Sequence, residues 1–208
     1  MSARQAASRP SKQARHDELI SAAFALFLER GFAATRLEDV AHHAGVAKGT
    51  VVVHFPTTEA LFTAVVIEHV APTVQRAESL RDAPGSPRER IVALVRFIHA
   101  SLLDPHVGGI PKLIVAEVGK FPELARGFHE QVCNRSRCAV AELVRQGIAA
   151  GEFRVIDPGL TARLLLDPLI MHAIWRHSLG RYEPEAVDSQ AFLDTHLDIF
   201  LRGIAAKV

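Results

Sequence analysis

Residues 35–61 read TRLEDVAHHAGVAKGTVVVHFPTTEAL, and this stretch predicts a helix-turn-helix. Its first apolar residues stand three and four apart, as one face of a short helix requires: Leu37, Val40, Ala41 and Ala44. Thr35 and Glu38 have the spacing of a capping box, in which two side chains satisfy backbone N–H groups at a helix start. Gly45 then stands where a helix end favours the left-handed conformation.

A second short helix follows the glycine turn, with Val46, Val51 and Phe55 on its inner side. The β-branched run 51–53 has strand propensity, but the capped helix before it and the spacing to Phe55 outweigh that weak preference. Two short helices joined by a glycine turn place the second helix in the major groove of DNA. The stretch therefore predicts DNA recognition.

The composition is that of a globular protein: 208 residues, 49% apolar and 23% charged, with a formal net charge of +1. No run approaches the roughly 18 apolar residues of a membrane span. Residues 1–16 contain basic side chains and no acidic one. We expect them to form a flexible basic arm suited to phosphate contact, with an ordinary solvated terminus as the alternative. They lack the apolar segment of a signal peptide, and we expect a cytoplasmic bacterial protein.

The rest of the chain also reads as helix, punctuated by proline and glycine, and we expect an all-α fold of about nine helices. The later helices are expected to begin near residues 57, 86, 110, 121, 157 and 189, with a break at 104–109 and a kink at Pro168. Cys133 and Cys138 stand five apart on one of these helices, which is too far for a disulfide, so we expect reduced thiols.

Residues 20–62, ISAAFALFLERGFAATRLEDVAHHAGVAKGTVVVHFPTTEALF, resemble the DNA-binding domain of TetR-family transcriptional regulators. Residues 112–128, KLIVAEVGKFPELARGF, are more loosely similar to the C-terminal domain of the AefR-like branch of that family. The resemblance implies a two-domain all-α homodimer that binds a palindromic operator, most often as a repressor. It also implies a pocket for a small apolar or amphipathic effector, whose binding releases DNA. We therefore expect a DNA-binding domain at 17–56 and an effector-binding and dimerisation domain at 57–208, joined through a helix at about 57–80.

Two positions depart from the pattern of the family. Val52 stands where the family usually has a tyrosine, and Thr58 stands where it usually has a lysine. Both customary side chains contact operator phosphates, so we expect weaker non-specific binding and a shallower salt dependence than in a typical member.

The outward side of the second helix supplies most of the candidate DNA contacts. Lys48 can reach a phosphate or a guanine edge, Gly49 permits close approach of the helix, and the valines suit thymine methyl groups. Arg36 is placed for a phosphate or minor-groove contact, although a solvated arginine is the alternative. The full set is Thr35, Arg36, Lys48, Gly49, Thr50, Val52, Val53, His54 and Thr58.

The candidate effector pocket rests on aromatic and polar residues among the later helices: Phe97, Glu117, Phe121, Phe128, Met171, His172 and Trp175. Glu117 lies on an otherwise apolar helix, where a buried carboxylate needs a partner. An effector can supply that partner, but pairing with a nearby arginine is the more common arrangement.

Two apolar stripes near the end of the chain exceed what one protomer needs and suit a two-fold symmetric interface. They consist of Leu160, Leu164, Leu165 and Leu169, and of Leu193, Leu197, Phe200, Leu201 and Ile204. Packing within one chain is the alternative.

No catalytic residues, metal or cofactor are expected. The sequence contains no GxSxG, P-loop or HExxH motif, and the adjacent His42 and His43 lack the i, i+4 spacing of a helical zinc site. Two other functions remain open: a helical enzyme or carrier with a vestigial helix-turn-helix, and a constitutive DNA-binding dimer without an effector.

Overall fold

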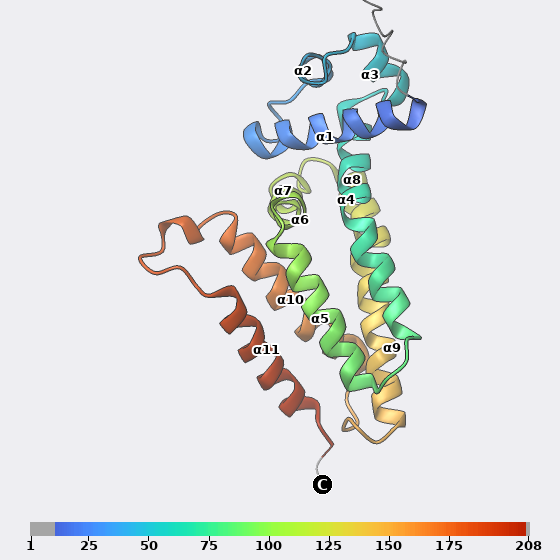
Figure 1. The fold of residues 1–208 in the computed structure, drawn as a ribbon, viewed down its shortest axis with the longest axis vertical. Coiled ribbons are helices and arrows are strands. Elements are labelled where there is room, and N and C mark those ends of the chain that lie inside the picture. Colours follow the sequence, from blue (N-terminus) through green and yellow to red (C-terminus); the bar gives the residue numbers. More distant parts are fainter. Residues whose placement is uncertain (1–10, 207–208) are drawn as a thin grey trace, which may run out of the picture. The chain divides into compact units, whose positions relative to one another are not determined.

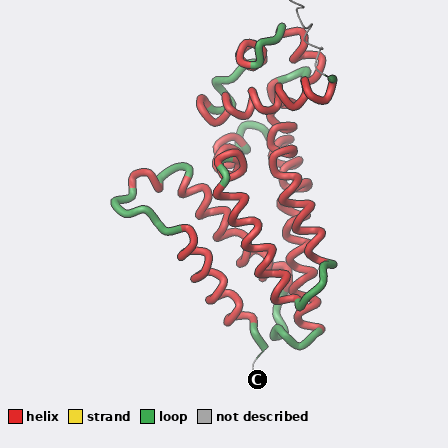
Figure 2. The backbone as a smooth tube through the Cα atoms, in the orientation of Figure 1, coloured by secondary structure: helices red, strands yellow, loops and turns green. Residues whose placement is uncertain are grey.

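The computed structural model describes residues 11–206 and is helical there, as Figures 1 and 2 show. Those residues include no β-strand, and an isolated bridge joins Phe153 to Ala205. The expected all-α fold is thus confirmed. The chain divides into two compact units, residues 1–65 and 66–208, and the division falls within one long helix, α4 (Thr58–Arg81).

Unit 1 contains α1 (Lys12–Arg30), α2 (Leu37–His43), α3 (Lys48–His54) and the first turns of α4. Its core is aromatic: the rings of Phe27 and Phe62 meet edge to face with centroids 5.0 Å apart, and both are fully buried. Residues 12–16, which were expected in a flexible arm, belong instead to α1, because the Ser11 hydroxyl accepts from the Ala14 N–H and caps the helix. The remainder of that arm, residues 1–10, lies outside the described residues.

Unit 2 holds the rest of the helices. They are α5 (Pro87–Leu103), α6 (Pro105–Gly108), α7 (Ile110–Glu117), α8 (Pro122–Phe128), η1 (His129–Asn134), α9 (Arg135–Ala149), α10 (Pro158–Arg176), η2 (Gly180–Tyr182) and α11 (Ser189–Ile204). Helices α5, α9 and α10 pack on one another, and α11 packs on α5 (Figure 1). Their shared core is aliphatic, with Ile91, Leu94, Leu143 and Leu165 among its fully buried side chains.

Local signals explain where these helices begin. Ser86 and Glu89 form a capping box, in which each side chain accepts from the backbone N–H of the other, and Pro87 occupies the first turn of α5. Asp157 caps α10 by accepting from the Leu160 N–H at 2.7 Å.

Two details differ from the expectation. The break at 104–109 contains the short helix α6, and the long helix after Pro122 includes one wide π-helical stretch, η1, between α8 and α9.

Candidate nucleic-acid interface and ligand pocket

The start of α2 differs by one residue from the predicted capping box. The Arg36 N–H donates to Asp39 Oδ2 at 2.9 Å, so Arg36 rather than Thr35 is the N-cap position. Thr35 is only 4% exposed, and its hydroxyl donates to the Gly31 carbonyl at 2.8 Å. The prediction that Thr35 contacts DNA is therefore wrong in this conformation, because its side chain fastens the α1–α2 turn instead.

The turn and the second helix form as predicted. Gly45 has φ +65°, the left-handed value that ends α2, and residues 48–54 form the helix α3 despite their β-branched run. Val51 is completely buried and Phe55 nearly so, which fixes one face of α3 on the unit. Burial of that face outweighs the low helix propensity of valine.

The opposite face of α3 is open. Val53 is 81% exposed and Val52 40% exposed, and Lys48 and Gly49 are exposed as well. Thr50 and His54 are half-buried, as is Thr58 at the start of α4. Val53 has little folding role, because most of its side chain gains no burial. Contact of these residues with DNA remains a prediction.

Two residues of the α3 face already have neighbours. The Lys48 ammonium pairs with the Glu38 carboxylate on α2, and this hydrogen bond holds the pKa of Glu38 below its usual value. The His54 ring lies 6.0 Å from the ring of His16 on α1. Arg36 is exposed beside α2 and adds to the positive field at Glu38.

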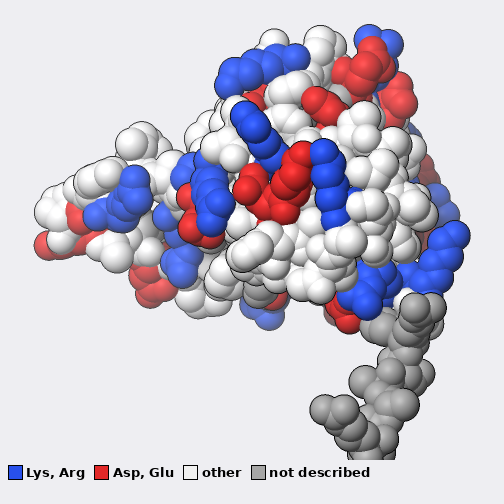
Figure 3. Space-filling model, turned by 90° about the horizontal axis from the view of Figure 1, so that it is seen from above, with Lys and Arg blue, Asp and Glu red and all other residues white. Residues whose placement is uncertain are grey.

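Charge is mixed on the face of the molecule in Figure 3, where Lys and Arg alternate with Asp and Glu among large uncharged areas. This agrees with the net charge of +1. Attraction to DNA would therefore depend on individual side chains more than on a broad basic surface.

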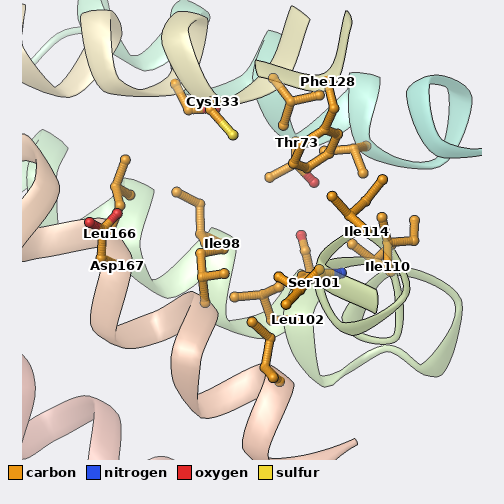
Figure 4. Close-up of a pocket in the computed structure, with 18 of the residues that line it drawn as sticks. Thr73, Ile98, Ser101, Leu102, Ile110, Ile114, Phe128, Cys133, Leu166 and Asp167 are labelled. Carbon is orange, nitrogen blue, oxygen red and sulfur yellow. The ribbon is translucent and has the colours of Figure 1, made fainter. Parts of the chain in front are cut away.

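Unit 2 contains a cavity of about 270 Å³, shown in Figure 4. Its lining comes from α4, α5, α6, α7, α8, η1, α9 and α10, and is apolar over most of its extent. Ile98 and Leu102 from α5 and Ile110 and Ile114 from α7 form its buried wall. Cys133 enters from η1, where the wide π turn displaces the side chains from an α-helical register.

Of the seven predicted pocket residues, Phe128 lines this cavity. The other six are not among its lining residues: Phe97, Glu117, Phe121, Met171, His172 and Trp175. Large aromatic residues were favoured in the prediction, whereas the wall is mostly aliphatic. Periodicity alone does not separate a cavity wall from a packed core.

Four of these six residues have another environment. Glu117 is 6% exposed and accepts from Lys120 Nζ at 3.5 Å, so its partner is a lysine one turn on. His172 stacks on Phe192 with ring centroids 4.2 Å apart. Met171 and Trp175 are exposed at the surface of α10, 59% and 41% respectively.

One edge of the cavity carries charge. Arg137 Nη2 donates to Asp167 Oδ1 at 3.0 Å, which links α9 to α10. Burial raises the pKa of the nearby Cys133 thiol; the positive charges of Arg137 and Arg163 oppose this rise, and Asp167 adds to it. Cys133 and Cys138 are both free thiols.

The predicted dimerisation stripes are only partly available at the surface. Leu160 and Leu164 are 63% and 69% exposed, whereas Leu165 and Leu169 are buried in unit 2. All of the predicted α11 residues are buried in the core of one chain: Leu193, Leu197, Phe200, Leu201 and Ile204. That half of the prediction is wrong, because α11 uses its apolar stripe to pack within its own chain.

A different apolar stripe is exposed. Leu160, Leu164, Met171 and Trp175 stand four, seven and four apart on α10, the repeat of one helix face, and Ile199 on α11 is 67% exposed. The half-exposed Asp167 stands between Leu164 and Met171 on this face.

A helix-turn-helix with an open recognition face, joined to a helical unit that encloses an apolar cavity, defines a ligand-binding DNA-binding protein. Residues 19–65 match the family described as "Bacterial regulatory proteins, tetR family", and residues 81–189 match "Tetracyclin repressor-like, C-terminal domain". The chain belongs to the TetR family of transcriptional regulators.

Known relatives agree in sequence and in fold. The chain is 27% identical over 198 residues to the HTH-type transcriptional repressor KstR2 of Mycolicibacterium smegmatis, covering 94% of this chain and 93% of that protein. The structure of the ketosteroid transcriptional regulator KstR2 of Mycobacterium tuberculosis is 25% identical with a TM-score of 0.70, and the match covers 98% of this chain and 100% of that one. A TetR-family regulator from Mesorhizobium loti is 25% identical with a TM-score of 0.73, covering 95% and 100%.

Within the described residues, no three His, Cys, Asp or Glu side chains are grouped so as to hold a metal ion. No single helix among the described residues is long and apolar enough to cross a membrane. Helices α3 and α4 are long and apolar enough only when taken together, and they are bent by 63° at their junction.

Proposed function

We propose that this protein represses transcription as a homodimer on a palindromic operator and releases the DNA when an apolar or amphipathic effector enters the unit 2 cavity. The observation that carries the proposal is the exposed face of α3. Val53 and the exposed part of Val52 gain little by folding, but thymine methyl groups in the major groove would cover them. Lys48 on the same helix and Arg36 at the start of α2 are exposed and available for phosphate or base contact.

The cavity favours an effector-responsive regulator over a constitutive one. A volume of about 270 Å³ exceeds ordinary packing voids and matches the lower end of small-molecule sites. The relative KstR2 is named as a repressor and as a ketosteroid regulator, and a Bacillus subtilis relative, 25% identical over 160 residues, is named as a fatty acid metabolism regulator. Both names suit largely apolar effectors.

The stripe of Leu160, Leu164, Met171 and Trp175 is the proposed dimer contact. Two copies of one helix face can meet isologously about a two-fold axis, which matches the symmetry of a palindromic operator. The helix α4 contributes Val70 and Thr73 to the cavity and also extends into unit 1, so it can transmit an effector's displacement to the DNA-binding unit.

The test is fluorescence anisotropy with purified protein and operators selected from genomic DNA. Specific binding that is weakened by Val53→Ser, without loss of thermal stability, would support the proposal. The matched control is Val155→Ser, which changes a valine that is 88% exposed in a loop of unit 2. If no genomic fragment is selected above random DNA, or if both substitutions act alike, the proposal fails.

A further inference from the structure

The unit 2 cavity has an apolar body and one charged edge. Its walls from α4, α5 and α7 carry aliphatic side chains with two hydroxyls, Thr73 and Ser101, and the Ser101 hydroxyl donates to the Phe97 carbonyl. Arg137 and Asp167 are the two charged residues among the described residues that line it. In Figure 4, Asp167 lies at the opposite side of the cavity from Ile110 and Ile114.

The charge at this edge favours an anion. The side chain of Arg137 is 26% exposed and that of Asp167 is 52% exposed, so the arginine is the more shielded partner. Arg163, which is not among the lining residues, adds a positive field at the Cys133 thiol. A shielded guanidinium therefore faces a more solvated carboxylate at the polar edge of the cavity.

The existing contact leaves Arg137 able to accept a better partner. A guanidinium carries five N–H donors and binds carboxylates best through two parallel hydrogen bonds. Asp167 engages it through one nitrogen, Nη2, at 3.0 Å. Half of the Asp167 side chain is already in water, so a displaced Asp167 can be solvated at little cost.

We propose that the cavity binds an amphipathic monoanion whose apolar body lies along α5 and α7 and whose carboxylate displaces Asp167 from Arg137. A cavity of about 270 Å³ is of small-molecule size, so an eight-carbon carboxylate is a suitable probe. The inference rests on the proposed function for its biological role, but ligand binding is measured separately from DNA release.

Displacement would change the contact between two helices. The Arg137–Asp167 pair links α9 to α10, and α10 also carries the exposed apolar stripe. An anion on Arg137 removes that link, whereas a neutral apolar molecule in the same cavity leaves it in place. The charged head group is therefore the part of the ligand that alters α10.

The experiment is isothermal titration calorimetry of the full chain at pH 7.5 with octanoate, 1-octanol and octylammonium. We expect octanoate to bind at least about tenfold more tightly than octanol, and octylammonium to bind most weakly. Arg137→Gln should weaken octanoate binding by roughly 10- to 100-fold and leave octanol within about twofold. Asp167→Asn should strengthen octanoate binding by up to about fivefold, because it removes the competing carboxylate.

The matched control is Arg145→Gln, which removes another ion-paired arginine from α9 outside this cavity. It should leave the binding of all three probes unchanged. The inference is overturned if none of the probes binds, if octanol equals octanoate, if octylammonium binds best, or if Arg137→Gln keeps the preference for octanoate. If octanoate binds as expected but operator affinity does not change, the effector role in the proposed function fails while the binding inference stands.

Discussion

The ion pair between Glu38 and Lys48 lies on the face proposed to meet DNA, and it offers a test of that face. Both side chains are more than half exposed. A phosphate that contacts Lys48 must compete with the Glu38 carboxylate, and that carboxylate also repels the DNA backbone. The substitution Glu38→Gln removes the competing charge but keeps the shape of the side chain.

The expected size of the effect follows from counterion release. One additional phosphate neutralised per DNA-binding unit steepens the log–log dependence of affinity on salt by about 0.9, and by about 1.8 for a dimer. Glu38→Gln should therefore bind operator more tightly at low salt. Its advantage over the unsubstituted protein should shrink about threefold between 0.1 and 0.2 M salt.

The assay is anisotropy with a labelled operator across that salt range. Glu29→Gln is the matched control, because it removes an exposed carboxylate from α1 that pairs with Arg30 instead. In a Lys48→Ala background the effect of Glu38→Gln should largely disappear, since the released cation is then absent. An unchanged slope for Glu38→Gln, or an equal change for Glu29→Gln, would refute the reasoning.

Four further outcomes are expected. Gly147→Ala should destabilise the protein by about 1–3 kcal/mol in urea unfolding, because the new Cβ would lie 2.0 Å from Phe153 Cδ2; Gly203→Ala on α11, with nothing within 4 Å, should not. Leu164→Glu should convert the dimer to a monomer in sedimentation velocity while the thermal unfolding of the chain is retained. Thr58→Lys should steepen the salt dependence of operator binding by about 1.8 per dimer, and an unchanged slope would contradict the phosphate role of that position. Burial lowers the pKa of three histidines in unit 2: His99, His172 and His177. In the unfolded chain these histidines bind protons at higher pH than in the folded chain. The free energy of unfolding should therefore be level above about pH 6.5 and fall as the pH drops below that value. Chemical unfolding measured from pH 8 to 5.5 would test this.

Local sequence signals were sufficient to predict most of the structure of the DNA-binding unit, because its geometry depends on residues that are close together in the chain. The glycine at position 45, the buried positions 51 and 55 and the exposed positions 52 and 53 follow from helical periodicity. The one-residue error at Thr35 has a local cause that the spacing of residues does not reveal. Its hydroxyl is held by the carbonyl of Gly31 in the preceding turn, and the capping role passes to Asp39.

The ligand cavity could not be located in the same way. Its wall combines residues from eight helical segments, and an aliphatic side chain facing a cavity has the same spacing as one facing a core. Cys133 faces the cavity from a π-helical stretch that the sequence pattern did not predict. The pairing of Arg137 with Asp167 spans 30 residues and depends on the packing of α9 on α10.

The dimer prediction shows what periodicity leaves undecided. Leu164 and Leu165 are adjacent and equally apolar, yet the first is 69% exposed and the second is completely buried. The stripes on α10 and α11 were correctly recognised as apolar, but only packing decides which of them is covered within one chain. On α11 the whole predicted stripe is buried within the chain, and on α10 half of the predicted stripe is buried.

Both proposed contacts of α10 lie on neighbouring parts of its surface, because Asp167 stands seven residues after Leu160 and four before Met171. Leu166 and Asp167 line the cavity, whereas Leu160, Leu164, Met171 and Trp175 form the exposed stripe. A ligand that displaces Asp167 and a second copy that covers the stripe therefore act on the same rigid element. If the ligand changes how tightly two protomers associate, association must change ligand affinity by the same factor. An effector of this protein would then have different affinities for the dimer and the monomer. The ratio of these affinities would equal the factor by which the effector changes the dimerisation constant.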